Sequence, residues 1–209
     1  MAIVILNGPT LCGKGTAYKV IRQLYSAGDG RIKKKLHEIA SALFNVPLDL
    51  WEQREGKEEP HPALGVSCVA YAQLMRHIKM PATPPRPGPR LLSPRQALIY
   101  VSEVICKPSF GADYFGRERA ERVSAPGLWV CESGGFIEEV QMLPPEEVCI
   151  IRIYGRGRFS PEDTRSYIDL PGAFCVEVQN VGTEREFLRA VVDTVDDFLH
   201  YQQTRAVAP

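Results

Sequence analysis

A glycine-rich stretch near the N-terminus carries residue types that bind polyphosphates. It runs from Gly8 to Thr16 and reads Gly-Pro-Thr-Leu-Cys-Gly-Lys-Gly-Thr. It directly follows the apolar run 2–6 and leads into a run with apolar residues at helical spacing. A strand, a glycine-rich loop and a helix in this order are the context that a phosphate-binding loop requires. The sequence therefore predicts a nucleoside triphosphate site at this loop.

Each part of the stretch has a separate chemical role in such a site. Backbone N–H groups of the loop and of the helix N-terminus bind phosphate oxygens. The Lys14 side chain reaches the β- and γ-phosphates, and the Thr16 hydroxyl binds Mg²⁺. ATP and Mg²⁺ are the predicted cofactors, and the residues assigned to them are Gly8, Gly13, Lys14, Gly15 and Thr16.

The composition narrows the class of protein. The chain has 209 residues, with 25 basic and 25 acidic side chains and a formal net charge of zero. This length suits one domain, or one domain with an inserted lid. The neutral balance gives no field that would hold nucleic acid or a membrane surface. No apolar run approaches the roughly 20 residues that span a bilayer, so we expect neither a membrane partner nor stable nucleic-acid binding.

The six cysteines form no metal-binding pattern, because no pair has the Cys-x-x-Cys spacing and the four histidines are scattered. Cys131, Cys149 and Cys175 lie inside apolar runs, where a free cysteine behaves as a small buried hydrophobe. This cysteine usage indicates a reduced, cytoplasmic protein.

Alternating apolar runs and helical patterns predict the elements that position these residues. Runs typical of buried parallel strands occupy residues 2–6, 128–131, 148–153 and 174–178. Helical spacing marks residues 32–44, 66–80 and 184–201. Ser93 and Pro94 begin a further helix, and Pro108 is expected to end it. The pattern predicts an α/β fold of three α/β/α layers, with a mostly parallel central sheet and one domain over residues 1–209.

Two stretches between these elements are predicted to lie on the surface. Residues 49–62 are charged and are expected to contribute no core. The stretch 81–94 contains six prolines. Proline is excluded from helix interiors and central strands, so an extended, semi-rigid loop is expected there.

Further polar residues follow the predicted strands, at the edge where such sheets bind ligands. Glu132 directly follows the strand 128–131, where a carboxylate holds Mg²⁺ through water or orients the acceptor phosphate. Further phosphate contacts are assigned to four arginines, for which the family resemblance given below implies a lid over a transferred phosphoryl group: Arg152, Arg156, Arg158 and Arg165. Arginine suits this role because its planar guanidinium binds phosphate oxygens bidentately.

A second set of residues could bind a further anion, which the family resemblance given below implies to be a phosphate acceptor. Arg95 lies in the first turn of a predicted helix, whose N-terminus favours an anion. Arg54, Lys57 and Lys107 are further cationic candidates, and Phe136 is a candidate to stack on a base. Each has a plainer alternative, which is a surface salt bridge for the basic residues and core packing for the aromatic ring.

Several pieces of the sequence share their spelling with a known family. They are Gly-Lys-Gly-Thr in the glycine-rich stretch, Ser-Pro-Arg-Gln-Ala-Leu-Ile-Tyr-Val-Ser-Glu from Ser93 with its Lys-Pro-x-Phe-Gly-x-Asp continuation, Glu-x-Gly-Gly-Phe from Glu132, and Asp-Thr-Arg-Ser-Tyr from Asp163. The first is similar to the nucleoside monophosphate kinases, adenylate kinase among them. Together the pieces resemble the phage deoxynucleoside monophosphate kinases, a branch of the P-loop nucleotide kinases, over residues 2 to about 167.

This resemblance implies ATP-dependent phosphorylation of deoxynucleoside monophosphates, which supplies precursors for DNA synthesis. It implies an acceptor-binding helical region over residues 28–110 and an arginine-bearing, lid-like segment over 154–170, in which Arg165 is the first candidate. Lys14, Glu132, Arg152 and Arg165 are the residues to which catalysis is assigned. The implied location is the cytoplasm, that of a host cell for a phage protein, and a homodimer is common among small kinases of this kind.

Two features depart from the family pattern, and two other functions stay open. The second strand, expected near residues 28–34, is barely apolar, and the loop 81–94 is longer than the pattern needs. One alternative is a P-loop kinase of a polynucleotide 5′ end, which would favour a basic groove, or of a non-nucleotide small molecule. The other is a non-catalytic nucleotide-binding regulator, against which the intact Lys14 and Thr16 count. The accepted bases and the sugar are also open.

Overall fold

The computed structural model describes every residue except 54, 80–87, 135–136, 160–165 and 208–209. The chain divides into two units, each with its own elements. Unit 1 combines Met1–Ile32 with Gly116–Pro209, and unit 2 is Lys33–Phe115. Unit 2 therefore contains most of the region 28–110 to which acceptor binding is assigned.

Unit 1 is built on a five-stranded sheet with the strand order β2-β5-β1-β6-β7. Its strands are β1 (Ala2–Asn7), β2 (Gly28–Asp29), β5 (Leu128–Cys131), β6 (Val148–Tyr154) and β7 (Phe174–Gln179). Every pairing within this sheet is parallel. The predicted α/β class with a mostly parallel sheet is confirmed. The weak apolar signal near residues 28–34 corresponds to an edge strand of only two residues.

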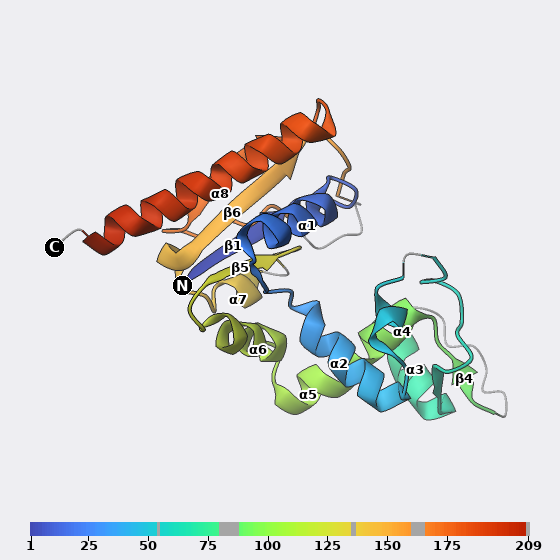
Figure 1. Cartoon of the computed structure of the whole chain (residues 1–209). Helices are drawn as coiled ribbons and strands as arrows, with labels where there is room; N and C mark the ends of the chain where they lie inside the picture. The colour runs from blue at the N-terminus through green and yellow to red at the C-terminus, as the bar shows by residue number, and fades with distance from the viewer. Residues whose placement is uncertain (54, 80–87, 135–136, 160–165, 208–209) are drawn as a thin grey trace. The chain divides into compact units, whose positions relative to one another are not determined.

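Helices cover both faces of the sheet, which gives unit 1 three layers (Figure 1). Helices α1 (Lys14–Tyr25) and α8 (Glu184–Val207) pack on one face. The other face is covered by α6 (Tyr114–Val123) and α7 (Ile137–Val140), and a 3-10 turn, Pro145–Glu147, precedes β6. No helix in the part of the chain that the structure describes is long and apolar enough to cross a membrane.

Strand β1 shows why its sequence is apolar without a break. Every one of its residues is buried. Successive strand side chains point to opposite faces, so Val4 and Leu6 pack toward α1 and α8. Ile3 and Ile5 pack with the core on the other face. Because both faces of the strand are covered, positions 2–6 are all apolar, which is the pattern that predicted it. The last residue, Asn7, is buried and polar.

Unit 2 is mainly helical. Its helical elements are α2 (Lys33–Phe44), the 3-10 turn Leu48–Trp51, α3 (Cys68–His77), α4 (Pro94–Ile99), the π-helical segment Tyr100–Cys106 and α5 (Lys107–Phe110). Its two short strands, β3 (Gly65–Val66) and β4 (Arg90–Leu91), form an antiparallel pair. Residues 81–87 of the proline-rich stretch 81–94 lie outside the described residues.

The helix that begins after Ser93 continues past Pro108, contrary to the prediction. Ser93 and Gln96 form a reciprocal capping box, with bonds of 3.2 and 3.0 Å between side chain and backbone. In the π-helical segment the Lys107 N–H donates to the Ser102 carbonyl. Pro108 then occupies the first turn of α5, where proline is tolerated. The helix ends instead at Gly111, which has a positive φ of 101°.

Two expectations about burial are wrong. The charged stretch 49–62 is predicted to contribute no core, but Leu50 and Trp51 are buried. The Trp51 indole N–H donates to the Ser41 hydroxyl at 2.7 Å. A core residue thus lies within a stretch whose charged residues led to the prediction of a surface segment. Cys175 is predicted to be buried, but its side chain is exposed because it points to the face of β7 opposite to the one that packs against the core.

The packing of α8 on the sheet can be tested at Phe198. Its side chain is fully buried, and its ring lies 5.7 Å from that of Phe174 in β7. We expect Phe198→Ala to lower the free energy of unfolding by about 3–5 kcal/mol, measured by urea denaturation. The control is Leu24→Ala, because Leu24 is 61% exposed on α1. Equal losses in the two variants would contradict the packing described here.

Candidate functional site

The glycine-rich stretch leaves the carboxyl end of β1 and turns into α1 (Figure 1). The backbone is left-handed at Leu11 and at Gly13, with φ of 66° and 105°. A Cβ at position 13 would lie 2.7 Å from Asn180 Nδ2 and 2.9 Å from Phe187 Cε1. Glycine is therefore required at position 13 by both its conformation and its close neighbours.

The N-terminus of α1 has no side-chain cap. Gly13 occupies the N-cap position, no side-chain hydrogen bond caps it, and the first turn contains no acidic residue. The first N–H groups of a helix have no partner within the helix, and the helix dipole adds partial positive charge there. An anion with several oxygens, such as a phosphate, is the partner that such an end binds best.

Lys14 is the first residue of α1, and its side chain folds back over the loop. Its Nζ donates to the Gly8 carbonyl at 2.7 Å and also contacts the Pro9 carbonyl. The same Nζ lies 3.5 Å from Cys12 Sγ. An ammonium group bonds more strongly to an anionic oxygen than to a neutral carbonyl. A bound polyphosphate would therefore compete favourably with the loop carbonyls for Lys14.

The residues around the loop fit a magnesium ion carried by a nucleotide. The Thr16 side chain is exposed in the first turn of α1. Among the described residues, no group of three or more His, Cys, Asp or Glu side chains could hold a metal ion. Mg²⁺ commonly keeps several waters and binds through substrate phosphates with only one or two protein ligands. Thr16 and phosphate oxygens would hold it here.

The segment after β6 packs directly on the glycine-rich loop. Gly157 has a positive φ of 72°, and a Cβ there would lie only 2.0 Å from the Thr10 carbonyl oxygen. Arg156 is exposed and donates from Nη2 to the Gly182 carbonyl at 2.9 Å. Arg158 is also exposed. The structure thus brings two of the four lid candidates to the edge of unit 1 that carries the loop, and Arg165 lies outside the described residues.

The Arg152 side chain is held by hydrogen bonds to Ile168 and Asp169. Its guanidinium donates twice to the Ile168 carbonyl, at 2.9 and 2.7 Å, and once to the Asp169 carboxylate at 2.9 Å. The buried side chain of Asn7 accepts from the Ile168 N–H at 2.8 Å and donates to the Ser166 carbonyl. Arg152 and Asn7 together tie the segment 166–169 to the ends of β1 and β6. A catalytic role for Arg152 would require it to release these bonds.

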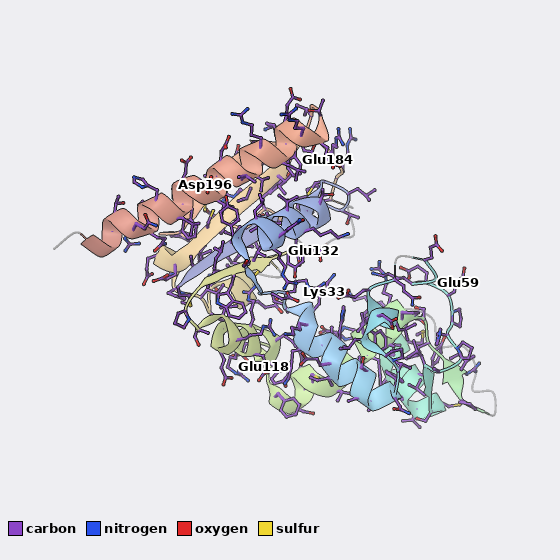
Figure 2. All side chains as sticks on the ribbon, viewed as in Figure 1. Lys33, Glu59, Glu118, Glu132, Glu184 and Asp196 are labelled. Atoms are coloured by element: carbon purple, nitrogen blue, oxygen red, sulfur yellow. The ribbon has the colours of Figure 1, made fainter. Side chains whose placement is uncertain are left out.

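Glu132 lies at the carboxyl end of β5 and is half-buried (Figure 2). No hydrogen bond or ion pair of its carboxylate is found in the described part of the chain. The turn that follows is fixed by Arg119 of α6, whose guanidinium donates to the carbonyls of Gly134 and Glu139 at 3.2 and 2.6 Å. Arg119 is fully buried, and this burial lowers the pKa of its guanidinium. Phe136 lies outside the described residues.

The acceptor candidates of unit 2 are engaged in contacts within that unit. Arg95 is 63% exposed, and its Nε lies 2.5 Å from the Glu58 carboxylate. Its backbone N–H donates to the Lys57 carbonyl at 3.1 Å. Lys107 pairs with Glu103 one turn earlier, at 2.7 Å. The structure therefore brings Lys57 and Arg95 together. Arg95 forms a surface salt bridge, which is the alternative to acceptor binding that the sequence left open. Arg54 lies outside the described residues.

Three buried polar residues that organise this edge were not singled out from the sequence. They are Asn7, Arg119 and Asn180. Asn180 directly follows β7, and its side chain donates to the Cys12 carbonyl at 2.9 Å. The rule that polar residues after parallel strands gather at one edge would have found it, because it stands two residues after the predicted strand 174–178.

No family model matches this chain, and no curated protein matches it.

The contact between the two loops can be tested by a pair of glycine substitutions. Gly157→Ala and Gly56→Ala both place a side chain at a left-handed φ, of 72° and 70°, but nothing lies within 4 Å of the Cβ at position 56. We expect Gly56→Ala to cost about 1–2 kcal/mol of unfolding free energy. Gly157→Ala should cost clearly more, because it also displaces the Thr10 backbone. Urea denaturation measures both, and equal costs would contradict the close approach of the loops.

Proposed function

We propose that this chain is a kinase that uses ATP to phosphorylate nucleoside or deoxynucleoside monophosphates to diphosphates. One observation carries the proposal: a glycine-rich loop at the end of a central parallel strand leads into a helix with an uncapped N-terminus, and Lys14 lies at its first position. Ligands of open α/β sheets bind beyond the carboxyl ends of the strands, which is where this loop lies.

The donor side of the reaction follows from this loop. In the proposed complex the N–H groups at the start of α1 and the Lys14 ammonium bind the β- and γ-phosphates, and Thr16 binds Mg²⁺. Phosphoryl transfer needs positioning and charge neutralisation more than covalent chemistry. Lys14 is already close to the loop and only has to exchange the Gly8 and Pro9 carbonyls for phosphate oxygens.

The acceptor side is supported by the resemblance to the phage deoxynucleoside monophosphate kinases. An acceptor phosphate is already ionised, so the reaction needs no strong general base. Glu132 is proposed to hold Mg²⁺ through water or to orient this phosphate. Arg95 and Lys57 of unit 2 are proposed to bind it, and Arg95 would exchange Glu58 for the ligand. An exposed ion pair contributes little to stability, so this exchange costs little.

The proposal predicts turnover that depends on a mononucleotide acceptor. We would measure ADP formation from Mg-ATP against a panel of ribo- and deoxyribonucleoside monophosphates. Lys14→Ala should lower kcat/KM by about 100- to 1,000-fold, because one charge that stabilises the transferring phosphoryl group is lost. Lys19→Ala is the matched control, because Lys19 is an exposed residue of the same helix, and it should behave as the wild type does.

The same experiment separates the alternatives. Binding of ATP without turnover on any mononucleotide would reject the monophosphate acceptor. Turnover on a polynucleotide 5′ end would then identify the second kind of kinase, and no turnover at all would indicate a regulator. An equal loss of activity in the Lys14 and Lys19 variants would remove the glycine-rich loop from the reaction.

A further inference from the structure

Asn180 joins three segments at the carboxyl edge of the sheet in unit 1. It directly follows β7 and is only 3% exposed. Its side-chain Nδ2 donates to the Cys12 carbonyl of the glycine-rich loop at 2.9 Å. Its backbone N–H donates at 2.8 Å to the carbonyl of Tyr154, the last residue of β6. One residue thus connects the loop after β1 with the ends of β6 and β7.

The bond to Cys12 fixes the direction of one peptide group in the loop. A peptide group is planar and trans, so the Cys12 carbonyl and the Gly13 N–H point in opposite directions. The carbonyl points toward Asn180, on the side where Phe187 of α8 also packs closely against Gly13. The Gly13 N–H therefore faces away from this buried side.

The other end of the Asn180 amide shows which of its groups acts. Among the described residues, Oδ1 is buried and has no hydrogen-bond partner. The Nδ2 group is therefore the half of the amide that has a partner, and this partner is the Cys12 carbonyl of the glycine-rich loop.

We propose that Asn180 is a positioning residue for the phosphate-binding loop. By holding the Cys12 carbonyl, it keeps the Gly13 N–H oriented toward the phosphates before the ligand arrives. The loop then loses less conformational freedom on binding, which increases affinity. This inference rests on the proposed function, because it assumes that the glycine-rich loop binds a polyphosphate.

The test measures binding of two probes, Mg-ATP and magnesium tripolyphosphate, by titration calorimetry. Asn180→Leu keeps the approximate size of the side chain but removes the donor, and we expect it to weaken both probes by about 10-fold. The matched control is Thr194→Val, which removes a buried hydrogen bond of 2.8 Å to the Ala190 carbonyl within α8. The control should lose stability in urea denaturation and keep its affinity for both probes.

The pH dependence of tripolyphosphate affinity in Asn180→Asp is a second test. A purely structural role of Asn180 would not produce such a dependence. Burial raises the pKa of a carboxyl group, so the substituted group is protonated at about pH 5 and can donate to the Cys12 carbonyl. At higher pH it is ionised and repels that carbonyl. We expect the aspartate variant to approach wild-type affinity for tripolyphosphate at about pH 5 and to lose it as the pH rises, when each value is compared with the wild type at the same pH. Asn180→Leu should show no such recovery.

The outcomes distinguish this inference from the proposed function. If the wild type binds neither probe, both proposals fail. If the wild type binds both probes and Asn180→Leu binds them equally well, only the role of Asn180 is overturned. The two pH values for Asn180→Asp compare one protein with itself, so they decide the question even where the leucine variant does not fold. A variant that binds equally weakly relative to the wild type at both pH values would overturn the role of Asn180.

Discussion

The parallel arrangement of the sheet is the constraint on which the rest of unit 1 depends. Strand β1 is hydrogen-bonded by β5 on one edge and by β6 on the other, and helices cover both of its faces. The chain that leaves β1 can therefore continue only beyond its carboxyl end. Because β5, β6 and β7 run in the same direction, the segments that follow them reach the same edge. Residues far apart in the sequence become neighbours there without any motif that links them.

The segments at this edge are held by backbone contacts and buried polar side chains. Gly157 lets its segment approach the Thr10 carbonyl, and Asn180 bonds to Cys12. Asn7 and Arg152 fix the segment that includes Ile168. None of these contacts caps the N-terminus of α1 with a side chain. The edge is thus rigid around a helix end that is left available, which is the arrangement that an anion-binding loop needs.

The sequence predicted those parts of the fold that depend on local patterns. The four longer strands of the sheet lie in predominantly apolar runs, and the helix after Ser93 begins with a capping box. Each of these signals is contained within a few neighbouring residues. The parts that were missed depend on distant partners. Asn180 acts on Cys12, which is 168 positions away, and Trp51 is buried although the residues after it are charged. Pro108 was misjudged because a π-helical segment places it in the first turn of a new helix.

The bonding of the arginines bears on which of them suits a transferring phosphoryl group. Arg152 has a side chain that is only 19% exposed, and two of its three bonds go to the Ile168 carbonyl. To reach a phosphate it must leave that carbonyl without its donor and free the segment that Asn7 also holds. Arg156 is exposed, and within the described part of the chain its one hydrogen bond goes to the Gly182 carbonyl, which solvent can replace. Exchange of partners therefore costs less for Arg156 than for Arg152. Of these two arginines, Arg156 is better suited to bind a ligand and Arg152 to hold the edge in place.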